Sequence, residues 1–421
     1  MRFSTLDAWL AWQESLHPSH IELGLERIAT VLLRLHAQPP PFPVITVAGT
    51  NGKGSSVAML EAILRAAGYQ VGTYTSPHLV RYNERVRLNG EPVSDALLME
   101  SFARIDATRA ETSLTYFEFG TLAALDIFFR GAPDVVVLEV GLGGRLDAVN
   151  VIDPTVALIT SISIDHADWL GDDRESIAIE KAGIMRAGQP VVFSGRDMPV
   201  SVAQWARELK ANLAVLGRDF HFQRRERDWR WWIDDTQPVM TLPHPALQGE
   251  HQFENAAGVL MVLHQLADHL PVSLEAMCQG LQQVVLPGRF QVIAAAVPWV
   301  LDVAHNPDGI RRLAEHLAAT PVTGRTLAVF GMLQNKDARA AIQQLQSQVD
   351  VWFTANLPSP SGASAADLAG LIQQQTGSDR VIACEDVGVA CDTAKAKARY
   401  GDRILVCGSF YTVAAALDHG I

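Results

Sequence analysis

The segment with the clearest chemical potential is a glycine-rich loop, GTNGKGS (49–55), which joins a buried apolar run to an amphipathic one. Its three glycines let backbone N–H groups turn toward an anion, and Lys53 adds a full positive charge. The start of the following helix presents further N–H groups that have no partner inside the helix. Together these features predict a loop that binds the phosphates of a nucleotide.

The loop departs from the standard phosphate-loop pattern, and a plain glycine-rich turn is the alternative interpretation. GxxxxGK[ST] needs Gly at position 47 and Ser or Thr at position 54, where the chain has Val47 and Gly54. Nucleotide binding at micromolar to millimolar strength requires about 4–8 kcal/mol. A helix dipole contributes only about 0.3–1 kcal/mol. We therefore expect the loop, Lys53 and a metal ion to act together.

Polar side chains follow three further predicted strands. Ser76 ends one of them, Glu139 lies near the end of another, and the third leads into His166. Because the carboxyl ends of parallel strands share one edge of a sheet, these side chains should lie near the phosphate loop. Oxygen ligands suit Mg²⁺, although His is an unusual ligand for it. A structural ion pair for Glu139 and a hydrogen-bonded loop histidine for His166 remain alternatives.

The elements that would position these residues alternate between strand and helix. Strands are predicted at 43–49, 70–76, 134–141, 154–163 and 189–194, with a helix at 55–68 that ends at Gly68. This alternation predicts an α/β fold, namely a mostly parallel sheet with helices on both faces. Aromatic and charged residues alternate over 218–240, which predicts an antiparallel excursion.

A second α/β region is predicted after the LPGRFQ segment at 286–291. Its strands are expected at 299–305, 325–333, 350–357, 380–385 and 403–409, and its helices at 308–319, 337–349, 364–375 and 388–400. We therefore predict two domains, an ATP-binding domain at 1–286 with a P-loop-type sheet and a smaller Rossmann-like domain at 287–421. The active site is expected in the cleft between them.

The composition narrows the classes of partner. Lys and Arg number 34 and Asp and Glu 46, so the net charge of −12 argues against a general nucleic-acid binder. No apolar run reaches the roughly 18 residues of a membrane span. Four scattered cysteines without CxxC spacing suit a reducing cytoplasm. An anionic ligand would then need a locally positive cleft, for which Lys53, Arg145 and Arg289 are candidates.

Several motifs occur in one order along the chain: GTNGKGS, TSPHL, TYFE, LEVGLGGRLDA, SIDHADWLG, EKAGI, LPGRF and DVAHNP. With them the chain resembles, essentially from end to end, the folylpolyglutamate synthases of the Mur ligase superfamily. GTNGK alone would indicate only the superfamily, whereas TYFE, LGGRLDA and LPGRF are specific to the folate branch.

The resemblance implies a role for each matching position in nucleotide and metal binding. Thr50, Asn51, Gly52 and Lys53 would bind ATP phosphates, and Asn255, Arg289 and Asp302 would contact the nucleotide. Ser76, Glu139 and His166 would bind Mg²⁺. Lys181 would be carbamylated to N6-carboxylysine and would bind or support a second Mg²⁺; a monovalent cation is also allowed. Lys53, Lys181 and His305 would be the catalytic residues.

Three further stretches match the segments that hold the pterin in this family. They are Glu22, Leu23, Gly24 and Leu25; Thr115, Tyr116, Phe117 and Glu118; and Leu146, Asp147 and Ala148. The family implies ATP-dependent ligation of L-glutamate to dihydropteroate and to tetrahydrofolate through an acyl phosphate. It also implies a monomer, while the composition predicts binding to neither nucleic acid nor membrane.

Two other functions fit parts of the pattern. A cell-wall Mur ligase would share GTNGK but should carry a separate N-terminal domain, for which the 48 residues before the loop leave no room. A nucleotide-dependent regulatory protein could use the loop without ligation. A guanine-reading NKxD motif is excluded because Ala338 stands at its last position. Arg81, Arg85 and Arg87 could attract glutamate or form a solvated strand face.

Overall fold

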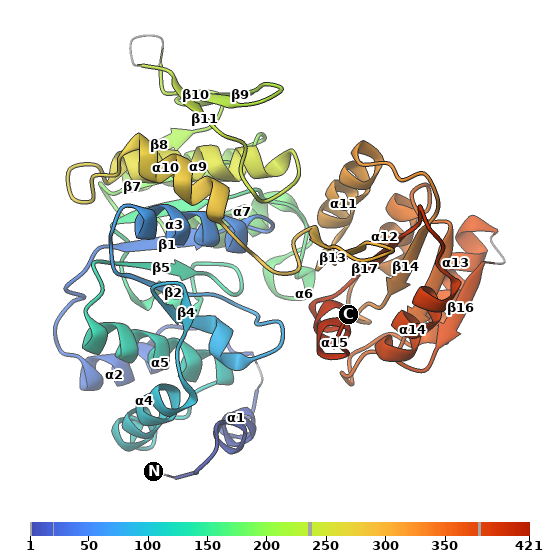
Figure 1. The fold of residues 1–421 in the computed structure, drawn as a ribbon. Coiled ribbons are helices and arrows are strands. Elements are labelled where there is room, and N and C mark those ends of the chain that lie inside the picture. Colours follow the sequence, from blue (N-terminus) through green and yellow to red (C-terminus); the bar gives the residue numbers. More distant parts are fainter. Residues whose placement is uncertain (1, 20, 235–237, 378–379) are drawn as a thin grey trace. The chain divides into compact units, whose positions relative to one another are not determined.

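The computed structural model describes residues 2–19, 21–234, 238–377 and 380–421 (Figure 1). The chain divides into two compact units. Unit 1 holds the residues up to His78, Asn83–Ala246 and Gln252–Val284, and unit 2 holds Leu79–Tyr82, Leu247–His251 and Val285–Ile421. No helix in these ranges has the length and apolar character that crossing a membrane would require.

Unit 1 is built on an eight-stranded sheet in the order β4-β3-β2-β5-β1-β6-β7-β8. Its strands are β1 (Val44–Ala48), β2 (Val71–Tyr74), β3 (Val86–Leu88), β4 (Glu91–Pro92), β5 (Val135–Glu139), β6 (Val156–Ile159), β7 (Pro190–Phe193) and β8 (Asn212–Val215). Strand β3 pairs antiparallel with both β2 and β4, and the other pairs of this sheet are parallel. The predicted mostly parallel sheet is therefore confirmed.

The central position of β1 places the phosphate loop at the middle of the sheet edge. Every residue of β1 and β5 is buried, as expected for strands that are apolar on both faces. In the register of the sheet, Val47 lies beside Glu139 and Ala48 beside Ile159. The loop that follows β1 therefore starts between the ends of β5 and β6.

Helices accompany these strands through the first 284 residues. They are α1 (Leu6–Ser15), α2 (Glu26–Leu35), α3 (Lys53–Ala66), α4 (Asp95–Arg109), α5 (Tyr116–Gly131), α6 (Ala167–Leu170), α7 (Arg174–Ala182), α8 (Val200–Leu209), α9 (His251–Gln265) and α10 (Leu274–Gln283), with 3₁₀ turns at Tyr82–Arg85 and Ala148–Val151. The predicted helix at 55–68 thus starts earlier, at Lys53. Gly68 follows it with a φ of +92°, a conformation that favours glycine.

The antiparallel excursion forms a separate three-stranded sheet. Its strands are β9 (His221–Arg224), β10 (Trp229–Trp232) and β11 (Met240–Leu242), with β10 in the middle. Residues 235–237 of the predicted segment lie outside the described residues. The sheet packs on α9, because the Trp231 indole donates to the carbonyl oxygen of Ala257 at 3.2 Å.

Unit 2 contains a six-stranded sheet in the order β12-β13-β17-β14-β15-β16. Its strands are β12 (Gln291–Ile293), β13 (Trp299–Asp302), β14 (Thr326–Phe330), β15 (Val351–Ala355), β16 (Val381–Cys384) and β17 (Arg403–Cys407). Its helices are α11 (Pro307–Ala319), α12 (Ala338–Leu345), α13 (Ala365–Thr376), α14 (Val387–Lys397) and α15 (Phe410–Asp418). Only β12 pairs antiparallel, so β17 joins β13 to β14 within a parallel sheet.

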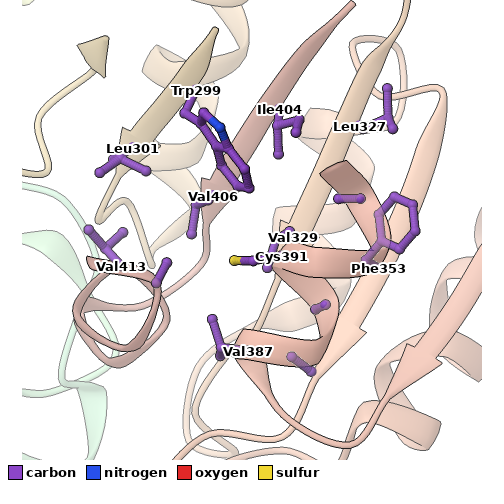
Figure 2. Packing of buried hydrophobic residues seen from close by; sticks show 14 of the residues in the cluster. Trp299, Leu301, Leu327, Val329, Phe353, Val387, Cys391, Ile404, Val406 and Val413 are labelled. Carbon is purple, nitrogen blue, oxygen red and sulfur yellow. The ribbon is translucent and has the colours of Figure 1, made fainter. Parts of the chain in front are cut away.

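The two faces of this sheet carry separate apolar cores. One core packs α14 and α15 against side chains such as Leu301, Val329 and Val406 (Figure 2). The other packs α11, α12 and α13 on the opposite face. Helices on both faces confirm the predicted α/β architecture of this region.

Candidate active site

The phosphate loop has a conformation that its glycines permit. Gly49 has a φ of +147°, and a Cβ atom there would lie 1.8 Å from the Thr160 hydroxyl oxygen. Gly52 has a φ of +93° and forms the N-cap of α3. Lys53 is therefore the first residue of the helix, next to its N–H groups, which is the arrangement expected of an anion site.

Two lysines meet at this loop. The Lys53 ammonium donates to the carbonyl oxygens of Gly49, at 3.1 Å, and Thr50, at 3.2 Å. The Lys181 ammonium donates to the same Gly49 oxygen at 2.9 Å. Burial, assisted by the charge of Lys53, lowers the pKa of Lys181 to about 7, against the opposing effect of Asp165 and Asp147.

Helix α7 holds Lys181 in this position. The Asp173 carboxylate caps the helix by accepting from two backbone N–H groups of its first turn, each at 2.9 Å. The Gly144 turn packs directly on the last turn, where a Cβ atom would lie 2.7 Å from the Glu180 carbonyl oxygen. Arg145, a predicted contributor of positive charge, forms an ion pair with Glu180 at 2.8 Å.

The three predicted metal ligands follow or end three strands of the sheet that holds the phosphate loop: Ser76 follows β2, Glu139 ends β5, and His166 lies in the segment after β6. Glu139 is the last residue of β5 and is buried, and the Ser76 N–H donates to its carboxylate at 3.4 Å. His166 forms the N-cap of α6 with a φ of +54°, and its N–H donates to the Asp165 carboxylate at 2.8 Å.

This donor set fits a metal ion that is shared with a substrate. Over the described parts of the chain, no three His, Cys, Asp or Glu side chains gather into a group that could hold a metal by themselves. A hydroxyl, a carboxylate and an imidazole beside a phosphate loop suit Mg²⁺, which completes its coordination with waters and phosphate oxygens.

Helix α9 brings Asn255 to the phosphate loop. The Asn255 amide lies so close to Gly52 that a Cβ atom on this glycine would be 2.4 Å from its oxygen. Asn255 donates to the buried Gln252 at 3.0 Å, and Gln252 donates to the Ser55 hydroxyl at 3.3 Å. Sequence reasoning missed Gln252, although its place one helical turn before Asn255 was a signal.

The three predicted pterin stretches also come together in unit 1. The Gly24 N–H donates to the carbonyl oxygen of Leu146 at 3.2 Å. Arg27 forms an ion pair with Glu22 and donates to Glu118 at 3.4 Å. Arg27 is a second residue that sequence reasoning left without a role, although it lies two residues after the predicted stretch that ends at Leu25.

Two features shape these stretches. Thr115 and Glu118 form a reciprocal capping box at the start of α5, which turns the Glu118 carboxylate back toward the Thr115 N–H at 2.8 Å. Asp147 is buried and accepts from the N–H groups of Leu142 and Val149 at 2.8 and 3.0 Å. Burial raises its pKa to about 6 despite these bonds.

Unit 2 gathers the three residues that the resemblance assigns to it. The Asp302 carboxylate accepts from the N–H groups of Phe290 and Ala304 at 2.9 and 2.8 Å. Burial raises its pKa, and Arg289 and His305 oppose that shift. Arg289 lies over the Phe410 ring at 5.1 Å, and the His305 ring lies 5.9 Å from it.

Two of the three arginines considered as glutamate attractors, Arg85 and Arg87, have different partners. Arg85 donates to the His78 ring at 2.8 Å and lies over the Tyr116 ring at 5.6 Å. Arg87 instead lies 3.6 Å from the buried Glu61. Arg87 therefore belongs to an ion pair between β3 and α3.

Two family models match the chain. The Mur ligase middle domain matches residues 47–263, and the Mur ligase, glutamate ligase domain matches residues 288–410.

Full-length relatives agree with these matches. A protein of Escherichia coli called dihydrofolate synthase/folylpolyglutamate synthase is 45% identical over 416 residues, which span 99% of this chain and 95% of that protein. The Escherichia coli structure in complex with DHPP and ADP superimposes with a TM-score of 0.93 at 44% identity, over 99% of this chain and 97% of the other. A bifunctional folylpolyglutamate synthase/dihydrofolate synthase with Mn, AMPPNP and L-glutamate bound gives 0.91 at 47% identity, over 99% and 98%.

Proposed function

The chain belongs to the Mur ligase family, in its dihydrofolate synthase/folylpolyglutamate synthase branch, and from this premise we propose the reaction that it catalyses. It is an ATP-dependent ligase that joins L-glutamate to 7,8-dihydropteroate, which gives dihydrofolate, and to tetrahydrofolate, which extends the glutamate tail. The observation that carries this proposal is the meeting of Lys53, Lys181 and the phosphate loop beside the Ser76–Glu139 pair.

The reaction proceeds in two steps. The carboxylate of the pteroate or folate attacks the γ-phosphorus of ATP, ADP leaves, and an acyl phosphate forms. The amine of glutamate then attacks the acyl carbon, and phosphate leaves as the amide forms. Lys53, the first residue of α3, would neutralise charge on the transferred phosphoryl group. A divalent metal ion held by Ser76, Glu139 and His166 would supply further neutralisation of the phosphate oxygens.

The remaining residues have separate proposed roles. The loop Thr50–Lys53 forms the site for the ATP phosphates, and Asn255, Arg289 and Asp302 contact the nucleotide. The stretches Glu22–Leu25, Thr115–Glu118 and Leu146–Ala148 bind the pterin. His305 acts at the site contributed by the C-terminal domain. The ATP-binding domain covers 1–286 and the glutamate ligase domain 287–421, close to the change between the two matched family models.

Lys181 is proposed to carry a carbamate. Carbamate formation needs a neutral amine, and the pKa of about 7 supplies one near neutral pH. The carbamate would supply oxygen atoms for a second Mg²⁺. We also propose a cytoplasmic monomer; all four cysteines are free thiols, which suits a reducing compartment.

The test is an acceptor assay. The protein is incubated with ATP, Mg²⁺, labelled glutamate and either dihydropteroate or tetrahydrofolate. Incorporation with both acceptors, and ATP consumption that depends on glutamate and a folate together, is expected. Absence of incorporation with either acceptor would overturn the proposed ligase reaction. Incorporation with tetrahydrofolate alone would remove the dihydrofolate synthase activity.

A further inference from the structure

Thr50 makes a two-way bond with one residue that lies far from it in sequence. Its hydroxyl donates to the carbonyl oxygen of Ser163 at 3.0 Å and accepts from the N–H group of Ser163 at 3.1 Å. This pair joins the phosphate loop to the segment that follows β6.

The other polar groups of Thr50 are engaged as well. Its N–H donates to the carbonyl oxygen of Ser161 at 2.7 Å, and its own carbonyl oxygen accepts from Lys53 at 3.2 Å. A bond from Thr50 to a phosphate would therefore replace a bond that the protein already makes, at a cost of about 1 kcal/mol each. The polar groups of Thr50 are therefore used within the protein, whereas an anion ligand needs groups that face the anion. We call the pair of hydrogen bonds between Thr50 and Ser163 the clamp.

The clamp is reinforced by its neighbours. The hydroxyls of Thr160 and Ser161 both donate to the carbonyl oxygen of Asn51, at 2.8 and 3.1 Å. Asn51 and Ser161 also form an isolated antiparallel bridge. Hydrogen bonds thus hold the segment 160–163 against the phosphate loop.

The clamped segment leads directly to a proposed metal ligand. His166 follows Ser163 by three residues and takes a left-handed conformation as the N-cap of the single-turn helix α6. Its position is therefore set from one side by the bonds that Ser163 makes to Thr50. A change in the phosphate loop on nucleotide binding would reach His166 through this connection.

We propose that Thr50 is a positioning residue that couples occupancy of the phosphate loop to the placement of His166, and that it does not ligate phosphate. This proposal rests on the proposed function, because a nucleotide and a divalent metal are what the two loops would hold. It predicts that loss of the Thr50 hydroxyl weakens the cooperation between metal and nucleotide more than it weakens nucleotide binding itself.

The test compares Thr50→Val, which keeps the shape and removes the hydroxyl, with Thr50→Ser, which restores it. ADP affinity is measured by calorimetry with a chelator and with Mn²⁺. For Thr50→Val, we expect metal-free ADP affinity within about twofold of the wild type and a loss of about tenfold in the gain given by Mn²⁺, the size of one or two ordinary hydrogen bonds. Thr50→Ser should recover most of that gain.

Thr46→Val is the matched control. Thr46 lies four residues earlier on β1, and within the described ranges its buried hydroxyl has no hydrogen-bond partner. This variant should keep the wild-type gain from Mn²⁺. An equal loss of ADP affinity with and without Mn²⁺ in Thr50→Val would identify Thr50 as a phosphate ligand and overturn the coupling.

A second measurement uses the unmodified protein and does not depend on the folding of a variant. Amide hydrogen exchange is followed over residues 161–166 with and without metal-free ADP. Slower exchange at Ser163 with ADP supports the coupling, and unchanged exchange at saturating ADP contradicts it. If the wild type gains no ADP affinity from Mn²⁺, the proposed metal-dependent function fails instead, so the two failures are distinguishable.

Discussion

Lys53 and Lys181 donate to the same oxygen atom, the carbonyl oxygen of Gly49, at 3.1 and 2.9 Å. Two like charges around one acceptor in a buried place are unfavourable, and the lowered pKa of Lys181 relieves the conflict. One lysine can remain a cation for phosphate binding while the other becomes a neutral amine.

Lys181 should therefore form its carbamate in a pH-dependent way. Because its pKa is lowered to about 7, the neutral amine is the minor form below this pH and the major form above it. With isotopically labelled bicarbonate, NMR should show a carbamate carbon signal that grows as pH rises from 6 to 8, both values being about one unit from that pKa. The signal should be absent in Lys181→Met and present in the exposed-lysine control Lys210→Met. A signal that Lys181→Met retains would contradict the assignment.

Lys53→Met should abolish turnover while the fold persists. The variant removes the charge next to the transferred phosphoryl group, so kcat should fall by at least about a hundredfold. Because Lys53 lowers the pKa of Lys181, that pKa should rise in the variant. Steady-state kinetics and the carbamate titration measure the two effects. Activity within about threefold of the wild type would remove Lys53 from the phosphate site.

Glu139→Gln should raise the Mn²⁺ concentration needed for half-maximal activity by about tenfold or more, since it replaces a charged oxygen ligand with a neutral one. Mn²⁺ binding measured by electron paramagnetic resonance should weaken in parallel. Glu111→Gln is the matched control, because Glu111 is exposed. Unchanged Mn²⁺ binding in Glu139→Gln would leave Glu139 with the structural role alone.

Gln252→Met should weaken nucleotide binding without changing the pterin site. Gln252 accepts from Asn255 and donates to Ser55, so its loss frees the Asn255 amide to rotate away from Gly52. We expect the Kd for ADP to rise about fivefold, the effect of one buried hydrogen bond. Gln265→Met, at the end of the same helix, serves as the control. Equal ADP affinities for the two variants would count against a role of Gln252 in orienting the Asn255 amide.

Arg27→Met should separate the pterin stretches. Arg27 links Glu22 to Glu118, and removal of its charge leaves the buried Glu118 carboxylate with fewer partners. The KM for dihydropteroate should rise about tenfold while the KM for ATP stays within about twofold. Arg34→Met, on the exposed face of the same helix, should change neither. A matching rise in both KM values would point to general unfolding, which a melting curve would reveal.

Strong apolar periodicity made most of the fold predictable. The strands around Val47, Glu139 and Ile159 are mostly apolar, and each was expected close to its observed position. The short strands β3, β4, β8 and β12 were missed because strands of two to four residues carry too little pattern to stand out from loops. Helix α15, which begins directly after the last strand expected at 403–409, was also missed.

The individual site residues were predictable only where a motif marked them. The glycines around Lys53 mark it as a candidate site residue, whereas no sequence motif marks Gln252 or Ser163. Ser163 meets Thr50 because β6 pairs with β1, and that pairing brings together residues more than a hundred positions apart. Such contacts follow from topology, which local patterns do not encode.

The position of β17 bears on how the C-terminal sheet is made in the cell. This strand comes last in the chain yet fills the middle of the sheet, between β13 and β14. During synthesis from the N-terminus, β13 and β14 are made before β17, so they cannot yet be joined through it into one sheet. Unit 2 can therefore close its sheet only after Arg403–Cys407 has left the ribosome, and a chain cut short by even this one strand would lose the link between its two halves.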